Sequence, residues 1–255
     1  MASDSEQTPL PIRKHEASVW SAHRRRPVFL AVLLIGLALF FIWLPVQART
    51  SLLSALNAQR GLFLLLFLFA LVTLSLIWSA GQRWDTRIFM LLNMRGYPRW
   101  LDRFMWATTQ LGNTLAAFIV AVLLYILDDR RLALEIILGS LTLWLLVETI
   151  KMLSDRGRPF IALVKTRIIG RREKGDSFPS GHTTQIFFLM TLIIHGFKLG
   201  LGQSLALYAV AALVGFTRIY VGAHYPRDVI AGMVLGSVWG ILATLVDPYW
   251  LVLRF

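Results

Sequence analysis

The 255-residue chain contains no cysteine, which excludes disulfide bonds, thiolate metal ligands and cysteine nucleophiles. Acidic residues are also scarce, because 14 Asp and Glu stand against 26 Lys and Arg and leave a formal net charge of +12. Polar residues are few in general: 56% of the chain is hydrophobic, whereas soluble domains are about 45–50% apolar. The composition is therefore that of a membrane protein.

The excess of basic residues would suggest a nucleic-acid partner in a soluble protein. Here the Lys and Arg residues lie in the loops between apolar runs, where anionic lipid head groups and orientation signals explain them better. We therefore expect membrane lipids as partners and no nucleic acid. A cleavable signal peptide is not evident, because the first apolar run begins only at Pro27, after a polar and basic tail.

A helix needs about 20 mostly apolar residues to cross a bilayer. Seven stretches approach this length and predict an all-α, polytopic transmembrane helix bundle: residues 27–46, 61–80, 113–127, 132–150, 183–198, 203–217 and 228–246. Between the second and third stretches, residues 83–105 alternate Arg with Trp, Phe, Met and Leu. This pattern favours a pair of amphipathic helices in the interface, broken at residues 96–98, over a solvated loop.

The first of three polar clusters runs from Lys151 to Arg158 and Pro159, at the end of the fourth apolar stretch. Pro159 should prevent a helix from continuing and hold Arg158 in an extended turn beside Lys151. Fixed cations suit a phosphoryl group, whose transfer needs mainly positioning and charge stabilisation and here no metal. The alternative for this cluster alone is a set of anchors to lipid phosphates.

The second cluster, Pro179-Ser180-Gly181-His182, reads as a turn that leads into a helix. Ser180 can cap that helix, and Gly181 lets the backbone approach an anion closely. Exposed amides at a helix start form an anion site, with His182 just inside the first turn. A simple capping turn is the alternative.

The third cluster contains Arg218, His224 and Asp228 at the start of the last apolar stretch. A carboxylate that accepts from one imidazole nitrogen fixes the tautomer and leaves the other nitrogen free as a nucleophile. Pro226 also allows a tight turn in which Asp228 caps the helix. An interfacial group of charges is the alternative, but three ordered clusters on one side of the membrane favour a shared site.

These clusters resemble the type 2 phosphatidic acid phosphatase superfamily, which also contains vanadium haloperoxidases. The family pattern is Lys, six residues, Arg-Pro; then Pro-Ser-Gly-His; then Ser-Arg, five residues, His, three residues, Asp. Every position matches except Thr217, which keeps the hydroxyl of the usual Ser. The resemblance covers residues 83–246 and implies a six-span phosphatase core, to which this chain adds an N-terminal span.

The resemblance also implies roles. His224 is the nucleophile that forms a phosphohistidine, Asp228 orients it, and His182 protonates the leaving oxygen and then activates water. Arg156, inside the first motif, is expected only to shape the turn. No metal or other cofactor is implied, and the implied phosphate-binding residues are Lys151, Arg158, Arg218, Ser180 and Gly181.

The predicted organisation follows from these assignments. It is a basic tail (1–26), two N-terminal spans (27–80), an amphipathic interfacial segment (81–107), a catalytic transmembrane core (108–247) and a C-terminal tail (248–255). We expect an integral protein of a bacterial inner (cytoplasmic) membrane with its site at the membrane–water interface. The excess of Lys and Arg on the side of the motifs favours the cytoplasmic face, whereas membrane members of the family carry the site on the opposite face.

The expected function is metal-independent hydrolysis of a lipid phosphate or diphosphate head group, such as phosphatidate, phosphatidylglycerophosphate or a polyprenyl diphosphate. A phosphotransferase that passes the phosphate to a hydroxyl acceptor is the alternative enzyme. The non-enzyme alternative, a seven-span transporter or lipid-binding protein, predicts polar residues along several spans near the midplane. Glu148 is expected to pair with Lys151 and to position it; the oligomeric state stays open.

Overall fold

The computed structural model describes residues 57–75, 79–154, 156–163 and 165–250, and the isolated positions 35, 39, 42 and 50. The described part of the chain is helical and contains no strand. Residues 59–255 form one compact unit, to which the following description refers. The predicted tail and, apart from three isolated positions, the first predicted span lie outside the described residues.

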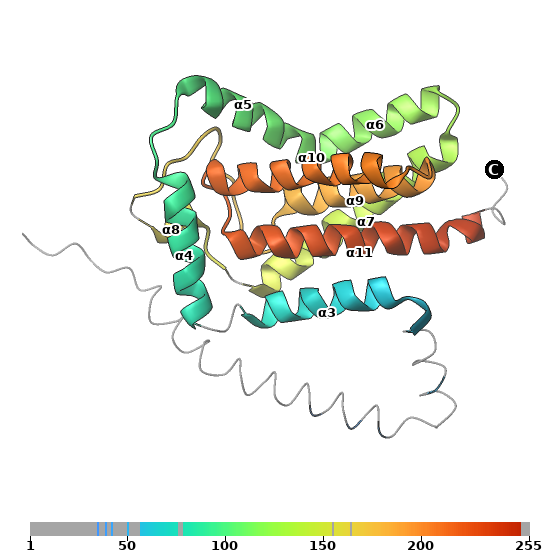
Figure 1. Ribbon diagram of the computed structural model, residues 1–255, viewed down its shortest axis with the longest axis horizontal. Helices are drawn as coiled ribbons and strands as arrows, with labels where there is room; N and C mark the ends of the chain where they lie inside the picture. The colour runs from blue at the N-terminus through green and yellow to red at the C-terminus, as the bar shows by residue number, and fades with distance from the viewer. Residues whose placement is uncertain are drawn as a thin grey trace, which may run out of the picture. The chain divides into compact units, whose positions relative to one another are not determined.

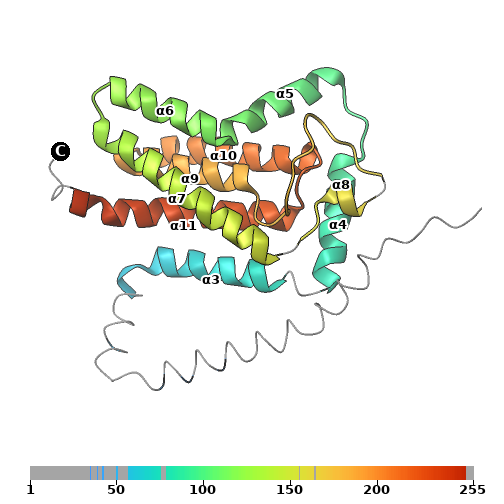
Figure 2. The same ribbon diagram turned by 180° about the vertical axis from the view of Figure 1, so that it is seen from behind.

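Helix α9 (Gly181–Gly196) is the centre of the bundle. It packs against α7 (Arg130–Ser154), α10 (Leu201–Tyr220) and α11 (Pro226–Trp250), which Figures 1 and 2 show side by side with it. Helix α3 (Arg60–Ser75) lies along α11, and α6 (Thr114–Ile126) lies along α7. These helices correspond to six of the seven predicted spans, which confirms the all-α bundle.

The packing of α11 on α9 depends on glycines spaced four residues apart, which form one face of α11. A Cβ atom on Gly236 would lie 2.2 Å from the Thr184 carbonyl oxygen, and one on Gly232 would lie 2.8 Å from the Ser180 carbonyl oxygen. Small residues at this spacing let two helix backbones approach closely, as is common between membrane helices. The close approach places the second and third motifs next to each other.

The predicted amphipathic pair forms α4 (Ser79–Asn93) and α5 (Arg99–Thr109), with the break at residues 94–98. On α4, Trp84 is 60% exposed and Leu91 is 61% exposed, whereas Phe89 is buried. Helix α5 continues through a 3-10 turn, η1 (Gln110–Gly112), into α6 with a bend of 60°. A helical pair is thus present where the alternative was a solvated loop.

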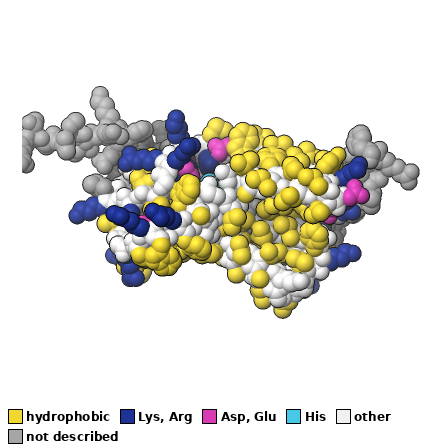
Figure 3. Space-filling view, turned by 90° about the horizontal axis from the view of Figure 1, so that it is seen from above, with side chains coloured by type: hydrophobic (Ala, Val, Ile, Leu, Met, Phe, Trp, Pro, Cys, Tyr) yellow, Lys and Arg dark blue, Asp and Glu magenta, His cyan; other side chains and the backbone are white. Residues whose placement is uncertain are grey.

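Three helices in the described part are long and apolar enough to cross a membrane, or four if the bent α5–α6 pair forms one span. Helices α3 and α9 have 16 residues each and are shorter. Figure 3 shows an apolar surface over the middle of the molecule, with Lys and Arg gathered at the end that carries α4 and the loop after the short helix α8 (Pro159–Ala162). An apolar belt with charged ends is the surface that an integral membrane protein presents.

Candidate active site

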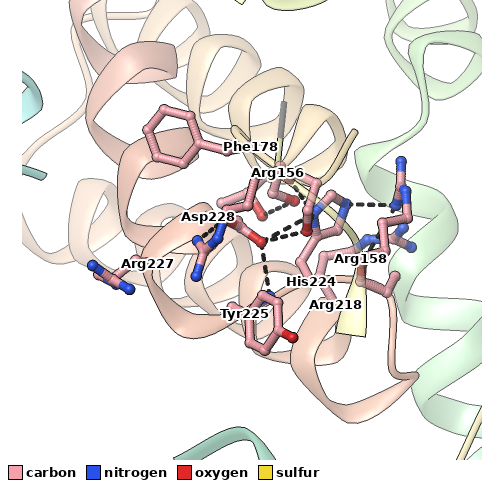
Figure 4. A network of polar contacts seen from close by, with 12 residues as sticks. Arg156, Arg158, Phe178, Arg218, His224, Tyr225, Arg227 and Asp228 are labelled. Carbon is pink, nitrogen blue, oxygen red and sulfur yellow. Dashed lines mark hydrogen bonds and ion pairs between the residues drawn. The ribbon is translucent and has the colours of Figure 1, made fainter. Parts of the chain in front are cut away.

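The three motif clusters meet at one end of the bundle. Lys151 lies in the last turn of α7, His182 in the first turn of α9, Arg218 in the last turn of α10 and Asp228 in the first turn of α11. His224 lies in the short connection between α10 and α11, and Figure 4 shows it between Arg158 and Asp228. The meeting of these helix ends therefore brings residues that are far apart in sequence together.

The His224 ring is buried and held through its Nδ1 atom. The ring is 1% exposed, and Nδ1 lies 2.7 Å from the Ser177 carbonyl oxygen. A carbonyl oxygen only accepts hydrogen bonds, so Nδ1 carries the proton and Nε2 keeps its lone pair. Nε2 lies 3.3 Å from Arg158 Nη1. The geometry presents Nε2 as the nitrogen available to a substrate.

Asp228 is connected to this histidine through Ser177. Its Oδ2 atom lies 3.7 Å from His224 Nδ1, which is beyond a hydrogen bond. Oδ2 instead accepts from the Ser177 hydroxyl at 2.5 Å and from the Tyr225 amide at 2.9 Å. Because α11 begins at Pro226, Asp228 is its third residue and bonds back to the preceding amide. The predicted direct carboxylate–imidazole bond and the predicted cap are both wrong; Ser177, which had no sequence signal, lies between the two groups.

Arg158, Arg218 and Glu173 form what we call the anion cluster. Arg158 Nη1 donates to Glu173 Oε2 at 2.8 Å, and Arg218 Nη2 donates to Glu173 Oε1. The same carboxylate lies 3.8 Å from His224 Nε2 and 4.0 Å from His182 Nδ1. Two arginines and two histidines thus surround one pair of anionic oxygens.

Glu173 comes from the loop between α8 and α9, and its side chain is 29% exposed. Burial alone would raise the pKa of Glu173, but the interaction with His224 and the charge of Arg218 outweigh it and hold the pKa well below its usual range. Sequence reasoning missed this residue. The available signal was a lone acid in the basic stretch 165–174.

Arg218 also holds an unpaired donor towards the site. Its Nη1 atom donates to Thr109 Oγ1 at 2.9 Å, and its side chain is 3% exposed. Its Nε atom is buried and has no hydrogen-bond partner among the described residues. A buried unpaired N–H costs about 1–3 kcal/mol, so a ligand oxygen at this position would be stabilising.

Lys151 approaches the site from α7. Its Nζ atom donates to Glu148 Oε1 at 2.7 Å, which confirms the predicted pair. A Cβ atom on Gly181 would lie 3.8 Å from the same Nζ atom, so the start of α9 and the lysine are neighbours. Arg158 has extended backbone angles before Pro159, as predicted, although Pro159 then begins α8 instead of ending all helical structure.

Ser180 occupies the predicted N-cap position of α9, but its side chain does not cap the helix among the described residues. Its hydroxyl oxygen instead accepts from Thr183 Oγ1 at 2.9 Å. The Ser180 amide donates to the Asp228 carbonyl oxygen at 3.0 Å. The predicted side-chain cap is therefore wrong, and Ser180 is fully buried between the second and third motifs.

Two cavities open beside the site and share Asn113, Glu173 and His182 in their walls. One, of about 290 Å³, extends along α7, where Leu143, Trp144 and Val147 form an apolar part of its wall. The other, of about 410 Å³, lies under the loop side and is lined by residues that include Trp106, Ile169 and Arg171. The anion cluster therefore lies between two cavities whose walls combine polar and apolar side chains.

A second group of charges lies on the other side of His224. Arg156 pairs with both Asp228 and Asp85, and Arg227 Nε donates to Asp85 Oδ2 at 3.0 Å. We call Asp228, Arg156, Asp85 and Arg227 the buried charge row. The sequence predicted only a shaping role for Arg156 and nothing for Asp85. In the described ranges, no three His, Asp or Glu side chains are arranged as metal ligands.

Comparisons with known proteins indicate the family of this chain. The family model described as PAP2 superfamily matches residues 131–251. An undecaprenyl-diphosphatase of Sulfolobus acidocaldarius is 28% identical over 72% of this chain and 90% of its own length. A lipid A 4'-phosphatase of Bacteroides thetaiotaomicron is 32% identical over 62% of this chain and 74% of its own length.

Solved structures show the same fold. Aquifex aeolicus LpxE has a TM-score of 0.56 and 30% identity, over 62% of this chain and 93% of that one. A phosphatidylglycerolphosphate phosphatase from Bacillus subtilis has a TM-score of 0.62 and 23% identity, over 74% of this chain and 96% of that one. That enzyme is a transmembrane PAP2-type phosphatase. The chain is an integral membrane lipid phosphatase that belongs to the PAP2 superfamily.

Proposed function

We propose that this protein hydrolyses a phosphate or diphosphate head group of a membrane lipid through a phosphohistidine on His224, without a metal ion. The observation that carries the proposal is the Glu173 carboxylate, which both arginines of the anion cluster contact within 4.0 Å of two histidines. A substrate phosphate would displace this carboxylate and take its place. Arg158 and Arg218 would then contact phosphate oxygens, and the unpaired Arg218 Nε would gain an acceptor.

The reaction has two displacements. His224 Nε2 attacks phosphorus, the bond from phosphorus to the lipid oxygen breaks, and protonated His182 gives its proton to that oxygen. Water then attacks the phosphohistidine, the P–N bond breaks, His182 takes a proton from the water and inorganic phosphate leaves. The Ser177 carbonyl supports this scheme, because it keeps the proton on Nδ1 and the lone pair on Nε2.

A lipid substrate is favoured by the apolar wall of the cavity along α7. Leu143, Trp144 and Val147 lie within one cavity that also reaches Lys151 and His224. Burying apolar chain there contributes about 25 cal/mol for each Å² removed from water. Polyprenyl diphosphates, lipid A phosphates, phosphatidate and phosphatidylglycerophosphate are the candidate substrates, in a bacterial inner membrane with the site at its surface.

The test is phosphate release in detergent with EDTA present, over those substrates and one soluble phosphate ester. His224→Ala should reduce release about 10⁴-fold. His195→Ala is the matched control, because His195 is exposed in the last turn of α9. Substantial release by His224→Ala would overturn the phosphohistidine. Transfer of phosphate to an added alcohol in preference to water would identify a phosphotransferase.

A further inference from the structure

The buried charge row lies behind the proposed nucleophile, on the side away from the cavities. The Asp228 side chain is 0% exposed, that of Asp85 is 1% exposed and that of Arg156 is 9% exposed. Charges buried to this extent are tolerated only when they are paired and hydrogen-bonded. Removing one member would therefore disturb the others.

Arg156 controls Ser177 from two directions. Its guanidinium pairs with Asp228, whose other oxygen accepts from the Ser177 hydroxyl at 2.5 Å. Its carbonyl oxygen accepts from the Ser177 amide at 2.7 Å. Because the Ser177 carbonyl holds His224 Nδ1, a shift of Arg156 would turn the imidazole. Figure 4 shows Arg156 beside Asp228 and the histidine beyond it.

Asp85 holds Arg156 in turn. The Arg156 guanidinium lies between Asp85 and Asp228, stacked 4.6 Å above the Tyr225 ring. Asp85 also accepts from the Arg227 amide at 3.1 Å and from Arg227 Nε at 3.0 Å. Asp85 therefore pairs with both Arg156 and Arg227, and Arg227 lies three residues after His224 in the chain.

Asp85 lies on α4, outside residues 131–251 that the family model matches. We propose that Asp85 is a positioning residue for His224, acting through Arg156, Asp228 and Ser177. The proposal rests on the proposed role of His224 as nucleophile. Asp85 borders neither cavity described above, so it should affect turnover of bound substrate and not binding.

The pH dependence of the rate is a measurement that would respond to the charge of Asp85 but not to a purely structural role. The charged groups around the His224 ring are Asp228 from α11, Arg158 from the start of α8, Glu173 from the loop, Arg218 from α10 and His182 from α9. Removing the negative charge of Asp85 makes proton binding in the site less favourable, whereas removing the positive charge of Arg156 makes it more favourable. The acid limb of the pH–rate profile should thus move to lower pH in Asp85→Asn and to higher pH in Arg156→Gln.

The experiment measures kcat, KM and the pH profile of the full-length protein in detergent, with rates normalised to folded protein. In Asp85→Asn we expect kcat to fall about tenfold to a hundredfold with KM within about twofold. Asp85→Glu should recover part of the loss. The matched control is Asp102→Asn, which breaks a similar ion pair to Arg167 (2.6 Å) on α5 and should leave kcat unchanged.

An unchanged kcat in Asp85→Asn would overturn the positioning role, as would acid limbs that move in the same direction in Asp85→Asn and Arg156→Gln. If Asp85→Asn does not fold, kcat of Asp85→Glu and Arg156→Lys decides, because both keep the charges but displace them: a lower kcat with KM within about twofold supports the positioning role, and an unchanged kcat in both overturns it. His224→Ala separates this proposal from the proposed function. An active His224→Ala refutes the nucleophile, whereas an inactive one together with normal Asp85→Asn refutes the positioning residue alone.

Discussion

The anion cluster and the buried charge row both combine arginines with carboxylates, on opposite sides of His224, and they differ in how firmly their carboxylates are held. Glu173 in the anion cluster is 29% exposed and borders both cavities. Asp85 and Asp228 in the buried charge row are 1% and 0% exposed and border neither. A carboxylate next to a cavity can leave and be replaced by a ligand anion, whereas one enclosed by arginines and packed side chains cannot.

The two ring nitrogens of His224 face these two regions, and the proposed mechanism makes a different requirement of each. On the cavity side, its Nε2 atom must face groups that can exchange one anion for another. On the buried side, the proposed mechanism requires its Nδ1 atom to keep one hydrogen bond throughout the reaction. Catalytic groups gain rate when surrounding dipoles are already oriented before the substrate binds. Four experiments that change one region at a time test this contrast.

The largest effect is expected from breaking the buried charge row at Asp228. Asp228→Asn leaves Arg156 without one of its two carboxylates and weakens the hold on Ser177. We expect kcat to fall about 10³-fold and the free energy of unfolding to fall by about 3 kcal/mol. Steady-state kinetics and thermal unfolding in detergent would measure both. Near-normal kcat in a folded variant would contradict the role of Asp228.

A smaller effect is expected from Arg158→Lys in the anion cluster. Lysine keeps the charge but cannot contact Glu173, the Gly175 carbonyl and His224 Nε2 at once, as the planar guanidinium does. We expect kcat/KM to fall about a hundredfold, and the free energy of unfolding to fall less than in Asp228→Asn because lysine keeps the positive charge. Substitution of the exposed Arg172, which borders neither cavity, by Lys is the control. A variant that loses stability as strongly as Asp228→Asn would remove the contrast between the two regions.

Glu173→Gln tests whether the carboxylate competes with phosphate. Without the competing charge, inorganic phosphate should inhibit about ten times more tightly. The pKa of Glu173 lies well below its usual range, so the native carboxylate stays charged as the pH falls from neutral through mild acid. The ratio of inhibition constants between variant and native protein should therefore stay constant down to about pH 5. Weaker phosphate inhibition in the variant would show that Glu173 assists binding instead.

The smallest effect is expected at the edge of the anion cluster. Glu148→Gln removes the ion pair to Lys151 (2.7 Å), but Glu148 is 44% exposed and water screens the interaction. We expect kcat/KM to change about twofold to fivefold. Lys151→Ala should cost more, because the lysine itself borders the cavity. If Glu148→Gln matched Lys151→Ala, the glutamate would have a larger role than positioning.

The helical bundle and the residues of the three motifs could be predicted from the sequence alone. Apolar stretches of helical length have few other stable structures in a membrane, because every backbone polar group must be hydrogen-bonded internally. The break at residues 94–98 follows from local Gly and Pro chemistry, and the Glu148–Lys151 pair follows from helical spacing. These features depend on residues close together in the chain.

The tertiary structure alone decided what surrounds His224. Ser177 lies 47 residues before His224, Asp85 lies 71 residues before Arg156, and Glu173 lies 45 residues before Arg218. No local pattern marks such partners, because they are brought together by the close approach of α9 and α11 and by the contact of α4 with the start of α11. The sequence thus determined which chemical groups are present, and packing determined that a serine carbonyl, and not the Asp228 carboxylate, holds the histidine.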